Sequence, residues 1–193
     1  MAPATTEPRL TPAARRVLDT AAHLFYTRGI TTVGMDLIAD EAGVTKKTIY
    51  DRFGSKQNLV TAYLRARDHR WRHHLTTRLD AAGPDPRARI LATYDALHAW
   101  TRAENTRGCA MVNAYAELSD PDHPGRRVAE EQKTWLHALY TRLLADAALP
   151  AAHADTLLIL HEGAVTAAAV AALPDAALTA RDAADRLLGT TPP

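Results

Sequence analysis

The residue that most constrains this chain is Gly43, which stands between two short segments with apolar residues at helical spacing. Before it, Ile38 and Ala39 put an apolar and a small group on one side of a helix. After it, Val44 and Ile49 supply the buried side of a second helix. Glycine tolerates the positive φ that a chain needs when it reverses between two helices. The stretch therefore predicts two short helices joined by a tight turn, the pattern of a helix-turn-helix.

The second of these helices carries its own start signal and a distinctive surface. Thr45 is expected to cap it by accepting an unpaired backbone N–H, and Ser55 is expected to cap the next helix. The side away from the apolar residues is basic and rich in hydroxyl groups, with Lys46, Lys47, Thr48, Tyr50 and Arg52. Lys56 falls in the first turn of the next helix, where the helix terminus already favours an anion such as phosphate. This combination predicts DNA binding, and the alternative is a solvated basic face on an ordinary helical hairpin.

The same stretch closely resembles the amino-terminal domain of TetR-family repressors. The matching residues are Ile38-Ala39, Ala42-Gly43-Val44-Thr45-Lys46, Thr48-Ile49-Tyr50, Phe53 and Ser55-Lys56. The resemblance is specific over about residues 10 to 65, and beyond that it is architectural only. Gly34 departs from the pattern, because Ser or Thr is commoner at this helix cap, but glycine caps nearly as well. The resemblance implies a bacterial repressor that binds operator DNA as a homodimer and responds to a small-molecule ligand.

The resemblance also implies roles for individual residues at the DNA. Lys46 and Lys47 are expected to touch base edges, because a lysine ammonium suits the O6 and N7 acceptors of guanine. Phosphate contacts, which set register without reading sequence, are expected from Thr32, Thr45, Thr48, Tyr50, Arg52 and Lys56. Asp51 lies on the same helix and has the same charge as phosphate, so it is expected to face away from the DNA.

Charge is distributed unevenly along the 193 residues. Residues 1–72 carry 12 Lys or Arg and 7 Asp or Glu, a net +5, whereas residues 73–193 carry 11 and 15, a net −4. A basic amino-terminal part on an acidic body suits a DNA reader whose remainder does not touch DNA. The one cysteine, Cys109, excludes an internal disulfide and fits a reducing cytoplasm. The chain has no apolar run long enough for a bilayer and its start lacks a signal-peptide pattern, so we expect a cytoplasmic protein with no membrane partner.

Helical periodicity recurs along the whole chain, and no strand pattern is present. The sequence predicts an all-α fold of about nine helices. Three domains or segments are expected: a disordered arm over 1–9, a helix-turn-helix domain over 10–55, and a helical regulatory and dimerisation domain over 56–193. The expected helices beyond the helix-turn-helix cover about 11–28, 56–82, 85–104, 109–118, 126–148, 152–172 and 176–188.

The last two of these helices are expected to form the dimer interface. Their apolar and small residues are Leu157, Leu160, Ala164, Ala168, Leu178, Leu187 and Leu188. The alternative is that these stripes only complete the core of one subunit. Dimerisation also follows from the DNA side, because a two-fold dimer doubles the base contacts of one helix-turn-helix on a pseudo-palindrome.

The family resemblance implies a ligand pocket enclosed by the middle helices. The candidate lining residues are Trp71, Tyr94, His98, Met111, Asn113, Tyr115, Trp135, His161 and Glu162. Asn113 and His161 stand out, because a polar group on an inward face needs a partner if it is buried. The mixture of aromatic and amide groups favours an apolar ligand with a few hydrogen-bonding groups. Ligand and DNA would then oppose each other through a population shift, with the long helix that starts at Lys56 as the transmitter.

Two other functions remain open from the sequence. His69 and His73 have the spacing of two metal ligands on one helix, but no HExxH motif or carboxylate cluster accompanies them. We therefore expect no cofactor and no enzyme activity, and Cys109 is interpreted as a small buried apolar residue. A DNA-binding dimer without ligand response, or an activator, is the nearer alternative. A pocket of several hundred cubic ångströms would favour ligand response, and a filled core would favour the alternative.

Overall fold

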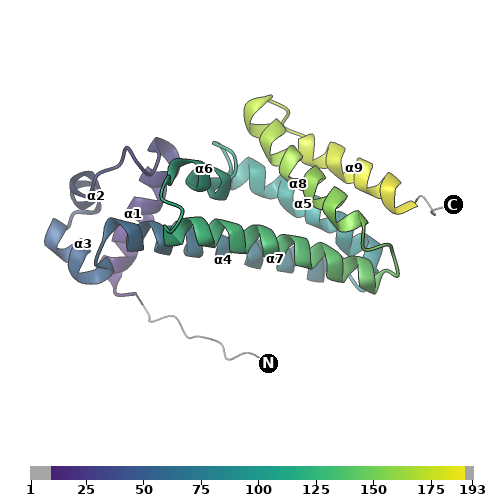
Figure 1. Ribbon diagram of the computed structural model, residues 1–193, viewed down its shortest axis with the longest axis horizontal. Helices are drawn as coiled ribbons and strands as arrows, with labels where there is room; N and C mark the ends of the chain where they lie inside the picture. Colours follow the sequence, from purple (N-terminus) through teal and green to yellow (C-terminus); the bar gives the residue numbers. More distant parts are fainter. Residues whose placement is uncertain (1–9, 190–193) are drawn as a thin grey trace. The chain divides into compact units, whose positions relative to one another are not determined.

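The computed structural model describes residues 10–189, which form nine α-helices and no strand (Figure 1). The helices are α1 Pro12–Arg28, α2 Met35–Ala42, α3 Lys46–Phe53, α4 Lys56–Ala81, α5 Pro86–Glu104, α6 Ala110–Glu117, α7 Pro124–Asp146, α8 His153–Val170 and α9 Ala176–Gly189. The predicted all-α class is confirmed. The arm predicted over 1–9 lies outside the described residues. None of the helices within residues 10–189 is long and apolar enough to cross a membrane.

The chain divides into two compact units, and the division falls inside α4, between Tyr63 and Leu64. In the first unit, α1 begins at Thr11, whose hydroxyl accepts the Ala14 N–H at 3.3 Å, and Pro12 occupies the first helical turn. The apolar stripe of α1 packs against α2 and α3, and the beginning of α4 completes this core. The rings of Phe25 and Tyr63 lie 5.8 Å apart within it. The residues buried here include Val17, Leu18, Ala21, Leu24, Ile38, Ile49, Leu59 and Val60.

The second unit is built around α5, which packs against α7, α8 and α9. Helices α8 and α9 run side by side, and α6 packs on α7 (Figure 1). Tyr94 of α5 is fully buried, and its hydroxyl donates to the Leu157 carbonyl oxygen of α8 at 2.8 Å. This bond lets a large aromatic ring fill the core while its polar end stays satisfied.

One helix begins earlier than the sequence predicts. We expected α7 to start near Arg126, because the preceding Pro-Gly pair reads as a loop, but it starts at Pro124. His123 caps it: its Nδ1 accepts the Gly125 N–H at 2.9 Å. Proline suits the first helical position because it has no N–H to leave unpaired. The histidine cap turns the expected loop into the first turn of the helix.

Candidate functional site

The turn between α2 and α3 has the geometry that its glycine predicts. Gly43 adopts the left-handed conformation, with φ 63° and ψ 41°. Its N–H donates to the Asp40 carbonyl oxygen at 3.2 Å, and the Val44 N–H donates to the Ala39 carbonyl oxygen at 3.0 Å. These bonds close the end of α2 and reverse the chain within two residues. The short side chain of Ala39 lies buried beneath the turn.

Helix α3 begins at the residue that the sequence indicates. The Thr45 hydroxyl accepts the Thr48 N–H at 3.2 Å, and the two threonine hydroxyls lie 2.9 Å apart. Ile49, fully buried, holds the helix to the core of its unit. The opposite side therefore faces solvent, with Tyr50 exposed. Of the residues expected at DNA, Thr32, Thr45, Lys46, Lys47, Tyr50 and Arg52 are exposed, and Thr48 and Lys56 are half-buried.

Helix α4 starts with the predicted serine cap, in which the Ser55 hydroxyl accepts the Asn58 N–H at 3.0 Å. The Asn58 side chain also donates to the Phe53 carbonyl oxygen of α3 at 2.9 Å, so the end of α3 is tied to the start of α4. Lys56 occupies the first position of α4. A cation here, beside the N–H groups of a helix terminus, provides the elements of a phosphate site.

Both lysines expected to read bases are paired with carboxylates. Lys46 Nζ lies 2.9 Å and 3.0 Å from the two Asp36 oxygens of α2, and this hydrogen bond and charge raise the pKa of Lys46. Lys47 Nζ lies 2.8 Å from Asp51 Oδ2, one turn further along α3. Asp51 therefore lies on the same side of α3 as Lys47, because side chains at i and i+4 lie on one face of a helix. The expectation that Asp51 faces away from the DNA stays a prediction.

The second unit contains a small cavity among α4 to α8. It has a volume of about 30 Å³, which is close to the space of one water molecule. Its wall contains Trp71 and Gln132, both more than nine-tenths buried. Trp71 Nε1 and Gln132 Oε1 have no hydrogen-bond partner among the described residues. The cavity wall therefore mixes apolar and polar groups, and two of its buried polar atoms remain unpaired.

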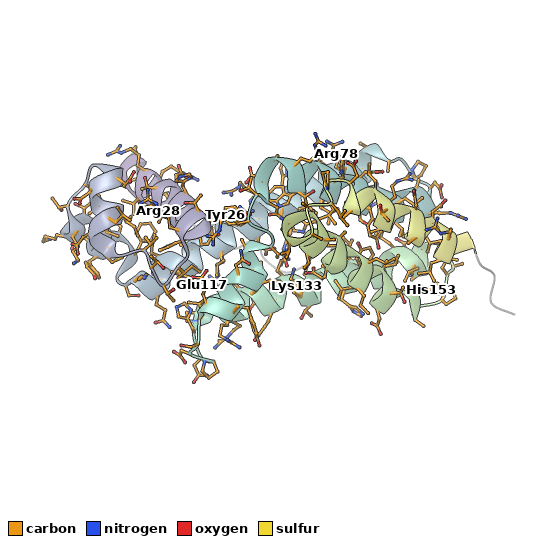
Figure 2. All side chains as sticks on the ribbon, turned by 90° about the horizontal axis from the view of Figure 1, so that it is seen from above. Tyr26, Arg28, Arg78, Glu117, Lys133 and His153 are labelled. Carbon is orange, nitrogen blue, oxygen red and sulfur yellow. The ribbon has the colours of Figure 1, made fainter. Side chains whose placement is uncertain are left out.

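A half-buried ion pair borders this cavity. Lys133, labelled in Figure 2, projects from α7 and places Nζ 2.8 Å and 2.9 Å from the carboxylate oxygens of Glu162 on α8. The same ammonium lies 3.4 Å from Cys109 Sγ. Burial by itself lowers the pKa of Lys133, but the charges and hydrogen bonds of Cys109 and Glu162 outweigh it, and the net effect raises the pKa. Lys133 is therefore charged at neutral pH.

A chain of hydrogen bonds connects His161 to α5. The Thr93 hydroxyl lies 2.7 Å from the Ile90 carbonyl oxygen and 3.1 Å from the Tyr140 hydroxyl. The Tyr140 hydroxyl in turn lies 3.0 Å from His161 Nδ1. The buried ring of His161 is therefore hydrogen-bonded at Nδ1. Burial and the charge of Lys133 lower the pKa of His161 to about 3, so the ring is neutral at physiological pH.

Arg67 of α4 also lines the cavity and anchors the end of α5. Its guanidinium donates to the Glu104 carbonyl oxygen at 2.6 Å and to Asn105 Oδ1 at 2.7 Å, and it lies over the Trp100 ring. A basic group suits the carboxyl end of a helix, where the last carbonyl groups lack partners within the helix. A change in the cavity wall at Arg67 would act directly on α4.

Helices α8 and α9 expose an unusual amount of apolar surface. Ile159 is 69% exposed, Val170 83%, Leu173 54% and Leu178 37%. An apolar groove of about 490 Å³ runs between the two helices and the loop that joins them. By contrast, Leu157, Ala164 and Leu188 are buried within the subunit. A contiguous apolar patch of this kind marks an interaction surface.

Comparisons with known proteins agree with this architecture. The family model described as bacterial regulatory proteins, tetR family, matches residues 17–63. An uncharacterized HTH-type transcriptional regulator of Mycobacterium tuberculosis is 29% identical over 152 residues, which cover 68% of this chain and 74% of that protein. The activator FasR of Mycolicibacterium smegmatis is 45% identical over 49 residues, 25% of this chain and 22% of its own. The structure of SCO4454, a TetR-family regulator from Streptomyces coelicolor, is 31% identical, covers 92% of this chain and 96% of its own, and superimposes with a TM-score of 0.83.

The chain belongs to the TetR family. It is a DNA-binding transcriptional regulator, and the resemblance inferred from the helix-turn-helix is confirmed. Because the similarity to SCO4454 extends over nearly the whole chain, the second unit shares the TetR-family fold as well.

Four of the nine residues expected to line a ligand pocket in this TetR-family regulator do line the cavity: Trp71, Met111, His161 and Glu162. The other five lie elsewhere. Tyr94 is buried in the core. The Trp135 ring lies under the guanidinium of Arg72, with 4.4 Å between the guanidinium carbon and the ring centroid, and the Tyr115 ring lies under that of Arg126 at 3.8 Å. His98 lies 3.9 Å from Asp175, and the Asn113 side chain donates to the Arg107 carbonyl oxygen at 2.9 Å.

Sequence reasoning missed other residues of the cavity wall: Arg67, Asn105, Gln132 and Lys133, while Cys109 was interpreted only as a small apolar residue. No local signal could identify them, because each is a polar residue of a helix or a loop. Whether such a residue points inward depends on how α4 to α8 pack together. His69 and His73 are both exposed on α4. No group of three or more His, Cys, Asp or Glu residues that could hold a metal occurs within residues 10–189.

Proposed function

We propose that this regulator is a homodimeric repressor that binds a pseudo-palindromic operator through α3 and is released from it by a small molecule. The observation that carries the DNA part is the α3 surface, which presents Lys46, Lys47 and Tyr50 to solvent on a helix fixed by Ile49 and the Gly43 turn. Lys46 and Lys47 contact base edges, and the hydroxyl groups, Arg52 and Lys56 contact phosphates.

The ion pairs of Lys46 and Lys47 with carboxylates are compatible with contacts from these lysines to bases. Both carboxylate pairs of α3 are exposed, with side-chain exposures of 47% and 77% for Lys46 and Asp36. Exposed ion pairs contribute little net stability, so pairing with a carboxylate does not prevent a base contact. Each ammonium has three N–H donors and can hold its carboxylate and a base acceptor at once.

Dimerisation through α8 and α9 is supported by their exposed apolar surface. The proposed contacts include Leu160, Ala168, Leu178 and Leu187, which are half-buried or exposed, together with Ile159 and Val170. Leu157, Ala164 and Leu188 support the helices from within the subunit, which is the alternative that the sequence left open for the whole stripe. Burying the exposed set against a second copy would remove the largest apolar side chains of this face from water.

The proposed ligand response depends on the cavity of the second unit. The cavity of about 30 Å³ holds nothing larger than a water molecule, so a ligand requires its walls to move. The polar groups at the cavity suit an apolar molecule with a few hydrogen-bonding groups. Arg67 gives such a movement a route into α4, the helix that crosses the division between the two units. The alternative is a DNA-binding dimer that responds to no ligand, or an activator, and the small volume of the cavity supports a regulator without ligand response.

Selection of random DNA duplexes by the purified protein, with binding repeated at two salt concentrations, tests the proposal first. A recovered pseudo-palindrome bound by a dimer would support the repressor assignment and provide an operator for ligand screening. Salt-sensitive binding without any recovered sequence would remove the assignment of Lys46 and Lys47 as base readers. A screen in which no small molecule alters operator affinity would favour the ligand-independent alternative.

A further inference from the structure

Lys46 is held by a residue outside its own helix. It occupies the first position of α3, and its ammonium bridges back to Asp36 in the first turn of α2, with both oxygens within 3.0 Å. The Lys46–Asp36 ion pair therefore connects α2 and α3 at the protein surface. Asp36 is 77% exposed, so it contributes nothing to the core and its carboxylate remains next to any DNA that α3 approaches.

A free lysine side chain has two competing targets in the major groove. A phosphate attracts any ammonium without regard to sequence, whereas a guanine O6 or N7 is reached only from a defined position. The Asp36 carboxylate restricts the four-carbon stem of Lys46 to conformations near the N terminus of α3. The remaining N–H donors of Lys46 then point to whatever lies in front of that terminus, which in a helix-turn-helix is the edge of a base pair.

We propose that Asp36 is a positioning residue for sequence recognition: it holds Lys46 for a base contact and withholds it from phosphates. The proposal rests on the proposed role of Lys46 as a base reader. Asp36 also acts on its own account, because a carboxylate close to the phosphates disfavours every DNA sequence alike. Specificity is a difference of affinities, so this uniform repulsion leaves it unchanged, and only the positioning of Lys46 widens the gap between operator and other DNA.

The variant Asp36→Asn tests this in the full-length protein. Binding is measured by fluorescence anisotropy on the selected operator and on an unrelated duplex of equal length, at several salt concentrations between about 50 and 200 mM. We expect binding to the unrelated duplex to tighten, and its slope of log K against log salt to steepen by about 0.9 as Lys46 neutralises one more phosphate. The ratio of operator to unrelated affinity should fall roughly tenfold, the effect of one lost base contact.

The matched control is Asp40→Asn. Asp40 is exposed one turn further along α2 and takes no part in the Lys46 pair, so the variant makes the same charge change without releasing the lysine. Its affinity ratio should remain that of the wild type. A ratio that falls equally in both variants would show a general charge effect and overturn the positioning role. Asp36→Ala provides the same test if the asparagine variant unfolds at a lower temperature than the wild type.

A double-mutant cycle separates the positioning role of Asp36 from the base contact of Lys46, on which that role rests. Lys46→Met is measured alone and combined with Asp36→Asn. If Asp36 acts through Lys46, the asparagine change has no effect on the ratio once the lysine is gone. A ratio lowered by Lys46→Met but not by Asp36→Asn overturns the role of Asp36 only. A ratio unchanged by Lys46→Met removes the base contact of Lys46 and the present inference with it.

Discussion

The buried histidine of the second unit should make the protein sensitive to mild acid. His161 is 3% exposed and is hydrogen-bonded through Nδ1 to Tyr140, so protonation would place a second charge beside Lys133 in the interior. Its pKa is about 3 in the folded protein and about 6.5 in an unfolded chain. The unfolded state therefore binds the proton more readily, and the free energy of unfolding falls as pH drops from 6.5 toward 3.

The size of this effect follows from linkage. Between pH 7 and pH 4.5 the unfolded histidine becomes almost fully protonated, while the folded one remains neutral. Each pH unit well below 6.5 corresponds to about 1.4 kcal/mol, and the slope is smaller above and near pH 6.5, so the loss from this group between pH 7 and pH 4.5 is about 2.5 kcal/mol. The contribution is fully present above pH 6.5 and is lost progressively below it.

The measurement is urea unfolding followed by circular dichroism at pH 7 and pH 4.5, at one protein concentration. We compare the wild type with His161→Asn, whose amide keeps a hydrogen-bonding group near the Nδ1 position. The variant is less stable at pH 7, but it should lose about 2.5 kcal/mol less on acidification. His69→Asn, a change on the exposed surface of α4, is the control and should behave as the wild type. Equal losses in wild type and His161→Asn would refute the reasoning.

Four further outcomes are expected. Gly43→Ala should lower the free energy of unfolding by about 1 kcal/mol in thermal or urea melts, because φ is +63° and alanine is strained in this conformation. The added carbon would meet no atom within 4 Å, so an unchanged stability would contradict the backbone-strain argument. Val170→Glu should shift the dimer to monomer in sedimentation experiments without lowering helicity, and an unchanged dimer would exclude this face. Lys56→Ala should weaken all duplexes alike and reduce the salt slope by about 0.9, whereas an effect on one operator alone would argue against a phosphate contact. Lys47→Ala should change preference between operators by about 1–3 kcal/mol in gel shifts, and neutrality on all of them would remove its assignment.

The helix-turn-helix was predictable because its determinants are local. Gly43, the Thr45 cap and the Ile49 contact lie within seven residues, and helical periodicity relates them without knowledge of the rest of the fold. The same reasoning located the start of α4 at the Ser55 cap. It failed at α7, where a histidine side chain supplied the cap and the Pro-Gly pair was interpreted as a loop.

The polar interactions that matter most to the proposals could not be inferred in this way. Asp36 and Lys46 are ten residues apart on two helices, and their pairing depends on the angle at which those helices cross. Lys133 and Glu162 lie 29 residues apart, and Tyr140 and His161 lie 21 apart. A periodic pattern states which side of a helix is apolar, but it does not state which helix lies opposite.

The sequence by itself therefore determined the helical class, the helix-turn-helix and the exposed cations of α3, because spacing along one helix sets which residues share a face. Only the tertiary structure decided which polar groups meet. It placed Trp71, Met111, His161 and Glu162 around a cavity of about 30 Å³, left Tyr115 and Trp135 outside it, and paired Lys46 with Asp36. These contacts arise from the packing of helices distant in sequence, and packing depends on the shapes of all the side chains between them at once.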